Sequence, residues 1–213
     1  MVEERTEAIR ALEATQRRRR LGVRWPAASV AIVLGVCGLF WVYPDVAYFF
    51  SPREPITLGT EGDYHFERLT SNRYAQIHGT PTQVAAYTRE GDVTMVHLGL
   101  RDTPVLVRRA ALEGEDWVPG RPPMAPDQRP FGVRGRLLAR KDAARFESGF
   151  KLLEHVDGVV PRDGKLWLLI EGERPSTFTG DLLIAIVLVL FVAANVFFLI
   201  RDIRARIAAR AAR

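Results

Sequence analysis

The side chains that most often bind metals or perform acid–base chemistry are few in this chain and far apart. The four histidines are His65, His78, His97 and His155, and no two have a spacing that suits a shared site on one element. His78 and His97 are the pair that neighbouring strands would bring together. Each histidine is otherwise expected to be an ordinary hydrogen-bonded or surface residue. The sequence therefore predicts no metal site.

Catalytic motifs are also absent from the sequence. The one cysteine, Cys37, lies in an apolar run, which excludes an intrachain disulfide and a cysteine-based metal cluster. The chain contains no nucleophile elbow, phosphate-binding loop or HExxH sequence. Its carboxylates are scattered and form no obvious catalytic pair. We therefore predict no catalytic residue and no cofactor, and favour a non-enzymatic protein over an enzyme.

Two long apolar stretches dominate the organisation of the chain. Leu182–Ile200 is nineteen residues long with one polar side chain, Asn195. As a helix it would be roughly 28 Å long, close to the ~30 Å hydrocarbon core of a bilayer. Pro26–Tyr43 is apolar except for Ser29, and Pro44 is expected to end it. Both stretches predict transmembrane helices.

The distribution of charge predicts how these helices are oriented. Residues 1–24 contain seven arginines against four glutamates, and residues 201–213 contain five arginines against one aspartate. Residues 51–177 are neutral, with eighteen basic and eighteen acidic side chains. Basic flanks beside apolar segments indicate the cytoplasmic side, so both termini are expected there. No basic patch is left for a nucleic acid, and none is predicted as a partner.

The predicted architecture is a membrane protein in which two transmembrane helices bracket a mainly β (α+β) extracytoplasmic domain. In a bacterium this places the protein in the inner membrane with a periplasmic central domain, and a mitochondrial inner membrane would give the same pattern. The predicted segments are a cytoplasmic basic N-terminal segment (1–24), the first transmembrane helix with an interfacial segment (25–50), the extracytoplasmic domain (51–177), the second transmembrane helix (178–200) and a cytoplasmic basic tail (201–213).

Strand patterns fill most of the central domain. Alternating or apolar runs separated by turn residues predict an antiparallel meander and a late hairpin. Gly132 and Gly135 suit a bend or bulge in the last long run. The domain is expected to form a small barrel of the oligonucleotide-binding (OB) type or a related α+β sandwich. The expected strands are Tyr74–His78, Val84–Thr88, Val93–Leu100, Val105–Val107 and Phe131–Leu138, with a hairpin of Val159–Val160 and Leu166–Ile170.

One helix is predicted in this domain, over Asp142–Val156, with Asp142 as its N-cap. Its apolar stripe is expected to pack on the sheet or to dock a partner; it consists of Ala143, Phe146, Phe150 and Leu153. The barrel core is expected to contain Ile77, Val96, Leu98, Val105, Val107, Val133, Leu137, Leu168 and Ile170, although a register slip of one residue would exchange the two faces.

A resemblance to a known family rests on the layout and one motif. Val105–Arg109, followed by Trp117-Val118-Pro119, resembles the "LVNRGWVP" signature of the surfeit-locus cytochrome oxidase assembly family, with Ala110–Asp116 between the two halves. Phe131–Leu138 corresponds to the strand that follows. The family has the same arrangement of two helices around a β-rich domain. The resemblance implies a respiratory oxidase assembly factor or a haem-handling protein.

The sequence itself favours a scaffold whose outer domain binds another membrane component. The expected partners are the lipid bilayer and another membrane protein or a second copy of the chain. Asn195 is too deep in the second helix to reach the interface, so it should point at protein or trapped water, level with 27–31 of the first helix. There Ala27, Ala31 and Gly35 repeat every four residues. The candidate partner-binding residues are Trp117, Val118 and Pro119 of the stiff proline-rich loop, together with Phe146, Phe150 and Asn195.

Overall fold

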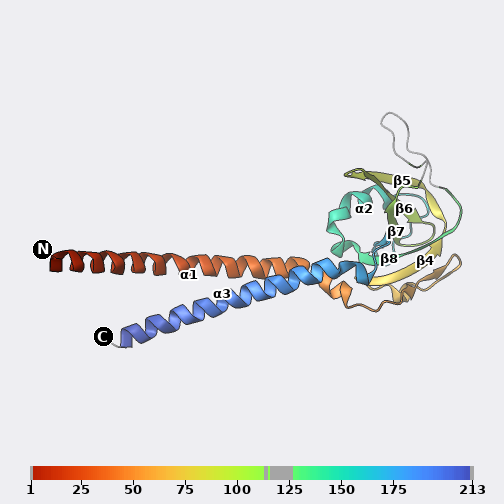
Figure 1. Cartoon of the computed structure of the whole chain (residues 1–213). Helices are drawn as coiled ribbons and strands as arrows, with labels where there is room; N and C mark the ends of the chain where they lie inside the picture. Colours follow the sequence, from red (N-terminus) through yellow and green to blue (C-terminus); the bar gives the residue numbers. More distant parts are fainter. Residues whose placement is uncertain (1, 113–114, 116–126, 212–213) are drawn as a thin grey trace. The chain divides into compact units, whose positions relative to one another are not determined.

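The computed structural model describes residues 2–112, 115 and 127–211 (Figure 1). The chain divides into two compact units. One is helical and comprises Met1–Val46 and Gly180–Arg213; the other is Ala47–Thr179. The second unit contains the sheet, so the chain has a mixed α+β fold with a large sheet and two long apolar helices. Each unit is described by itself below.

The helical unit is built from two helices, α1 (Val2–Phe49) and α3 (Thr179–Ala211). The segments Pro26–Phe49 and Pro175–Ala205 are long and apolar enough to cross a membrane, and few of their residues are buried. The predicted end of the first helix at Pro44 is wrong, because α1 runs through Pro44 to Phe49. A proline inside a helix loses one backbone hydrogen bond, at a cost of about 3 kcal/mol, and α1 continues in spite of this cost.

Small residues bring the two helices close together. A Cβ atom on Gly35 would lie 2.5 Å from Val192 Cγ2, and one on Gly38 would lie 3.2 Å from Leu188 Cδ1. The two glycines therefore leave room for α3 side chains that any larger residue would displace. Gly35 belongs to the small-residue repeat recognised in the sequence. The contacts also fix the register of the antiparallel pair, with residue 35 opposite 192 and residue 38 opposite 188.

A seven-stranded sheet forms the frame of the second unit, and its strand order is β1-β4-β8-β9-β7-β6-β5. A separate hairpin pairs β2 (Gly59–Thr60) with β3 (Asp63–Tyr64). The strands of the large sheet are β1 (Ile56–Thr57), β4 (Arg73–Gly79), β5 (Pro81–Glu90), β6 (Val93–Leu100), β7 (Val105–Ala110), β8 (Phe131–Ala139) and β9 (Trp167–Glu171).

The strand pairing confirms part of the predicted meander. β5, β6 and β7 are consecutive antiparallel neighbours, and β6 has the predicted bounds. β4 instead pairs with β8, and the late hairpin is wrong. β9 lies between β7, to which it is parallel, and β8, to which it is antiparallel, while Val159 bridges Thr103. These pairings join segments distant in sequence, which local turn signals cannot reveal.

The sheet buries apolar side chains on both faces. One core cluster comprises Leu58, Ala75, Ile77, Val96, Leu98, Leu100, Val105, Val107, Val133, Leu137 and Leu169. The other face carries a second cluster under a helical segment, and it includes Leu106, Leu138, Leu168 and Ile170. Seven of the nine predicted core residues belong to the first cluster. Leu168 and Ile170 belong to the second, because β9 is buried on both faces and so has no alternating pattern.

The sheet is not a closed barrel among the described residues: β1 and β5 are its two edges. The predicted OB-type closure is therefore not shown. In Figure 1 the sheet curves strongly, with α2 on the β5–β6 side. Closure would need a seventh pairing, between the edge strands β1 and β5, and the two-residue β1 offers few backbone groups for it.

The predicted helix over Asp142–Val156 is shorter and more broken than expected. It consists of η2 (Arg140–Asp142), η3 (Ala144–Phe146) and α2 (Glu147–Leu153). Asp142 does not cap α2; its carboxylate accepts a hydrogen bond from Ser71 Oγ at 2.5 Å. The apolar stripe is nevertheless confirmed as a packing face, because Ala143, Phe146, Phe150 and Leu153 all lie in the second core cluster.

Candidate functional site

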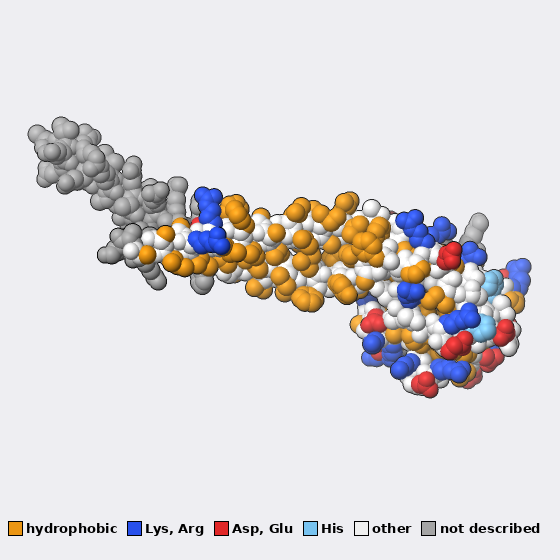
Figure 2. Space-filling view, turned by 90° about the horizontal axis from the view of Figure 1, so that it is seen from below, with side chains coloured by type: hydrophobic (Ala, Val, Ile, Leu, Met, Phe, Trp, Pro, Cys, Tyr) orange, Lys and Arg blue, Asp and Glu red, His pale blue; other side chains and the backbone are white. Residues whose placement is uncertain are grey.

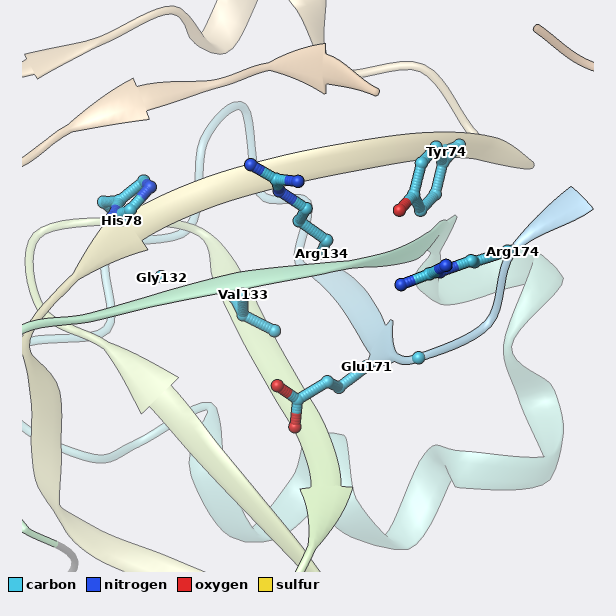
Figure 3. A pocket seen from close by; sticks show the side chains of 8 residues that line it. Tyr74, His78, Gly132, Val133, Arg134, Glu171 and Arg174 are labelled. Atoms are coloured by element: carbon cyan, nitrogen blue, oxygen red, sulfur yellow. The ribbon is translucent and has the colours of Figure 1, made fainter. Parts of the chain in front are cut away.

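The candidate site is an open groove of about 420 Å³ on the β4–β8–β9 part of the sheet (Figure 3). Most of its lining residues are polar or charged, unlike the two core clusters. Strand β4 supplies Tyr74 and His78, strand β8 supplies the centre, and the segment after β9 supplies the far end. The lining residues are Tyr74, His78, Gly132, Val133, Arg134, Glu171, Gly172 and Arg174.

Two glycines in β8 allow close approaches that a side chain would block. Gly132 is paired with His78, and a Cβ atom there would lie 2.4 Å from the imidazole, so the ring rests on the glycine backbone. Gly135 lies where a Cβ atom would meet the Ile170 carbonyl oxygen. The pairing of β4 with β8 runs without a shift from Arg73 to Gly79, so the expected bulge at these glycines is wrong, and the bend remains a prediction.

Two exposed arginines give the groove its charge. Arg134 projects from β8 on the same face as Tyr74 and His78, since Gln76 lies opposite it and side chains alternate. Arg174 follows β9, and Figure 3 shows its side chain extending back toward Arg134. Among the described residues, neither guanidinium has an acidic partner within 4.0 Å. Both remain available to an anionic ligand.

The groove also contains one carboxylate, Glu171. Burial raises the pKa of Glu171, and Arg109 opposes this rise. Glu171 lies opposite Gly135, which is on the core side of β8, and Figure 3 shows its side chain on the other side of β8 from Arg134. Glu171 therefore does not neutralise the cationic side of the groove.

A neighbouring arginine, Arg136, is in contrast fully committed to the structure. Its guanidinium lies 4.7 Å from the centre of the Tyr48 ring and 5.0 Å from that of Phe178, and Nε donates to Asn72 Oδ1 at 2.8 Å. Tyr48 donates its hydroxyl to the Glu173 carbonyl oxygen at 2.9 Å. Tyr48 and Phe178 lie near the beginning and the end of the second unit, so their contacts with Arg136 hold both ends of this unit against β8.

A second polar cluster lies buried beneath α2. Arg108 pairs with Glu90 at 2.5 Å and stacks over the Phe146 ring at 4.8 Å. His97 is 3% exposed and its Nε2 lies 3.3 Å from Thr88 Oγ1. Burial lowers the pKa of His97 to about 4; Arg108 acts in the same direction and Glu90 against it. The histidine is therefore neutral near pH 7; Arg108 is buried with it, whereas the Glu90 carboxylate is exposed.

A larger and more apolar groove, of about 860 Å³, lies near the start of the helical segment and includes Leu69, Leu166 and Trp167. Lys141 and Lys165 also line it. Arg140 forms ion pairs with both Glu147 and Glu154, and hydrogen bonds to these carboxylates raise its pKa. Arg140 is therefore paired, whereas Lys141 and Lys165 have no acidic partner within 4.0 Å among the described residues.

The four histidines are not brought together. His78 lies in the groove, His97 is buried, and their strands are not neighbours, so the expected meeting across neighbouring strands is wrong. His65 and His155 lie 3.6 and 3.8 Å from glutamates nearby in sequence. In the part of the chain that the structure describes, no group of three or more potential metal ligands occurs.

The predicted partner-binding residues have different surroundings. Trp117, Val118 and Pro119 lie outside the described residues. Phe146 and Phe150 are 8% and 1% exposed and pack in the second core cluster, so neither offers an exposed ring to a partner. The Asn195 amide donates to the Phe191 carbonyl oxygen at 2.8 Å, so its own helix already supplies one partner. Arg134 and Arg174 were not predicted, because exposed arginines in a charged domain carry no distinguishing sequence signal.

Comparison of the chain with protein-family models, with curated proteins and with solved structures gives no match. The function is therefore argued from the chain itself.

Proposed function

We propose that the chain is a non-enzymatic membrane protein. In this proposal α1 and α3 span a bilayer, and the β-rich unit lies outside the cytoplasm and binds or scaffolds another membrane component. In a bacterium the membrane would be the inner membrane. The surfeit-locus type of role, in oxidase assembly or haem handling, remains the alternative.

The observation that carries the proposal is the exposure of apolar side chains along both helices. Phe40, Trp41 and Leu190 are 77%, 81% and 64% exposed, and Figure 2 shows apolar side chains covering the visible surface of the helical pair. Apolar surface costs about 25 cal/mol per Å² when it stays in water, and monomers rarely expose large continuous patches of it. A bilayer removes this cost. The paired glycines further support two helices that stay together in lipid.

Fractionation of cells that express the full chain tests membrane insertion. We expect the chain to remain in the membrane pellet after extraction with alkaline carbonate and to be released by dodecyl maltoside. Release by carbonate alone would contradict the proposal.

Affinity purification in the mild detergent, with partners identified by mass, tests the scaffold role. Reproducible recovery of another membrane protein is expected. Recovery of the chain alone, as a monomer, would oppose the scaffold role.

The haem-handling alternative is favoured by one observation, the exposed imidazole of His78 in an open groove. A visible absorption spectrum of the purified full chain distinguishes the two proposals. A Soret band that disappears in His78→Gln would support the alternative.

A further inference from the structure

We propose that the β4–β8–β9 groove binds the phosphate headgroup of an anionic phospholipid, with Arg134 and Arg174 as its anchors. This inference rests on the membrane insertion proposed above and adds a ligand class and a site to it. The occupant is a lipid of the surface that the chain itself crosses.

Charge complementarity is the first argument. Arg134 and Arg174 line the same groove, and among the described side chains neither has an acidic partner within 4.0 Å. Most other arginines of this unit are paired, as Arg108 is with Glu90 and Arg140 with Glu147 and Glu154. A planar guanidinium binds phosphate through two parallel hydrogen bonds. Two unpaired guanidinium groups on one groove therefore favour a phosphate oxyanion over a neutral ligand.

The position of Arg174 in the chain is the second argument. The segment able to cross a membrane begins at Pro175, so Arg174 precedes it directly. Helix α3 begins at Thr179, five residues after Arg174, and successive Cα atoms are ~3.8 Å apart, so Arg174 lies within about 19 Å of the start of α3 along the chain. Chain connectivity alone therefore keeps Arg174 near the membrane surface. The groove extends from Arg174 toward Arg134 (Figure 3).

The chemistry of the remaining lining suits a headgroup. Tyr74 and His78 present a hydroxyl and an imidazole on the face of the sheet that carries Arg134, and such groups hydrogen-bond the glycerol or phosphate oxygens of a lipid. The groove is open, so a headgroup can enter while its acyl chains remain in the bilayer. The 860 Å³ groove also carries cations, Lys141 and Lys165, but an ammonium is a point charge and does not bind phosphate through two parallel hydrogen bonds as a guanidinium does.

A titration of the full chain in dodecyl maltoside tests this inference. The probes are dioctanoyl phosphatidylglycerol, dioctanoyl phosphatidylcholine and inorganic phosphate, with binding measured by microscale thermophoresis. One basic side chain at a membrane surface contributes about fivefold in affinity. We expect phosphatidylglycerol to bind most tightly of the three probes. The R134Q/R174Q variant should lower the affinity for phosphatidylglycerol roughly 25-fold, because it loses two contributions of about fivefold each. R134K/R174K, which keeps both charges, should lose less than about fivefold.

The control pair is R53Q/R89Q, which removes the same charge from two exposed positions outside the groove, one of them close after the first apolar helix. It should leave the affinity for phosphatidylglycerol unchanged within about twofold, since both side chains are exposed and neither lines the groove. Equal losses in the two pairs, no preference over phosphatidylcholine, or equally tight binding of inorganic phosphate would overturn the inference. Release of the chain by carbonate would instead overturn the proposed membrane insertion, so the two failures are distinguishable.

Discussion

At the residue scale, two arginines next to each other on one strand each form an ion pair, on opposite faces of the sheet. Arg108 and Arg109 are adjacent on β7 and point to opposite faces, where Glu90 pairs with the first and Glu115 binds the second through two hydrogen bonds of 2.6 and 2.7 Å. In the sequence both belong to a motif that resembles a family signature. In the structure each has a local electrostatic partner, which is a sufficient physical reason for an arginine at either position.

Arg136, which is buried and bonded, and Arg134, which is exposed, form a matched pair of β8 residues for mutagenesis. Arg136→Ala removes a buried guanidinium from Tyr48, Phe178 and Asn72, and should lower the free energy of unfolding by about 3 kcal/mol. Arg134→Ala, on the same strand and face, should cost less than about 0.5 kcal/mol, because its side chain is exposed. Chemical denaturation of the full chain in detergent measures both values. Equal destabilisation would contradict the assigned roles.

His97 should make the stability of the protein depend on pH. Its folded pKa of about 4 lies below the unfolded value of about 6.5, so the unfolded state binds the proton first as the pH falls. Stability is therefore highest above pH 6.5 and declines between pH 6.5 and 4, by up to about 3 kcal/mol.

His97→Gln should flatten this dependence. Carboxylates titrate in both proteins, so the difference between the two denaturation curves isolates the histidine. Parallel curves from pH 7 to 4 would show that His97 is not held neutral.

At the element scale, sequence patterns predict the elements that have one apolar and one polar face. They do not predict the orientation of a strand that is apolar on both faces. The β6 strand has the predicted bounds, and the apolar stripe containing Phe146 and Phe150 is buried as expected. In β9, Leu168, Leu169 and Ile170 are all buried, so the sequence holds no information about which face is which. The two parallel pairings, of β1 with β4 and β7 with β9, join distant segments. The groove depends on the pairings of β4 with β8 and of β8 with β9, which also join distant segments, so its location could not be predicted.

The register of the helical pair gives a cross-linking prediction. Gly35 lies opposite Val192 and Gly38 opposite Leu188, so one turn further along Ala31 should lie level with Asn195. A disulfide needs Cα atoms about 4.4–6.8 Å apart. With Cys37 replaced by Ala, the cysteine pair at 31 and 195 should therefore form a disulfide on mild oxidation.

Cysteines at 27 and 195 form the control, since four residues displace position 27 by about 6 Å along the helix axis. This pair should stay reduced under the same conditions, as judged by gel mobility with and without reductant. A disulfide at 27–195 but not at 31–195 would mean that the helices are paired in another register.

At the scale of the whole molecule, two units of different chemistry share one chain. The helical unit exposes apolar side chains, whereas the second unit buries its apolar residues in two clusters and leaves charges outside. Charges at the centre of a bilayer cost about 2.5–3.5 kcal/mol each on translocon scales, so residues 51–177 cannot lie within it. The chain thus leaves the membrane once and returns, if both apolar helices cross it.

The proposed topology follows from the basic flanks. Residues 1–24 and 201–213 carry an excess of arginine, which favours a cytoplasmic location for both termini. Alkaline phosphatase, which is active only outside the cytoplasm, should be active when fused after residue 100 and inactive when fused after residue 213. A fluorescent reporter that matures only in the cytoplasm should give the opposite result at the same two positions. If alkaline phosphatase were equally active at both, α3 would not return the chain across the membrane, and the two-helix topology would be wrong.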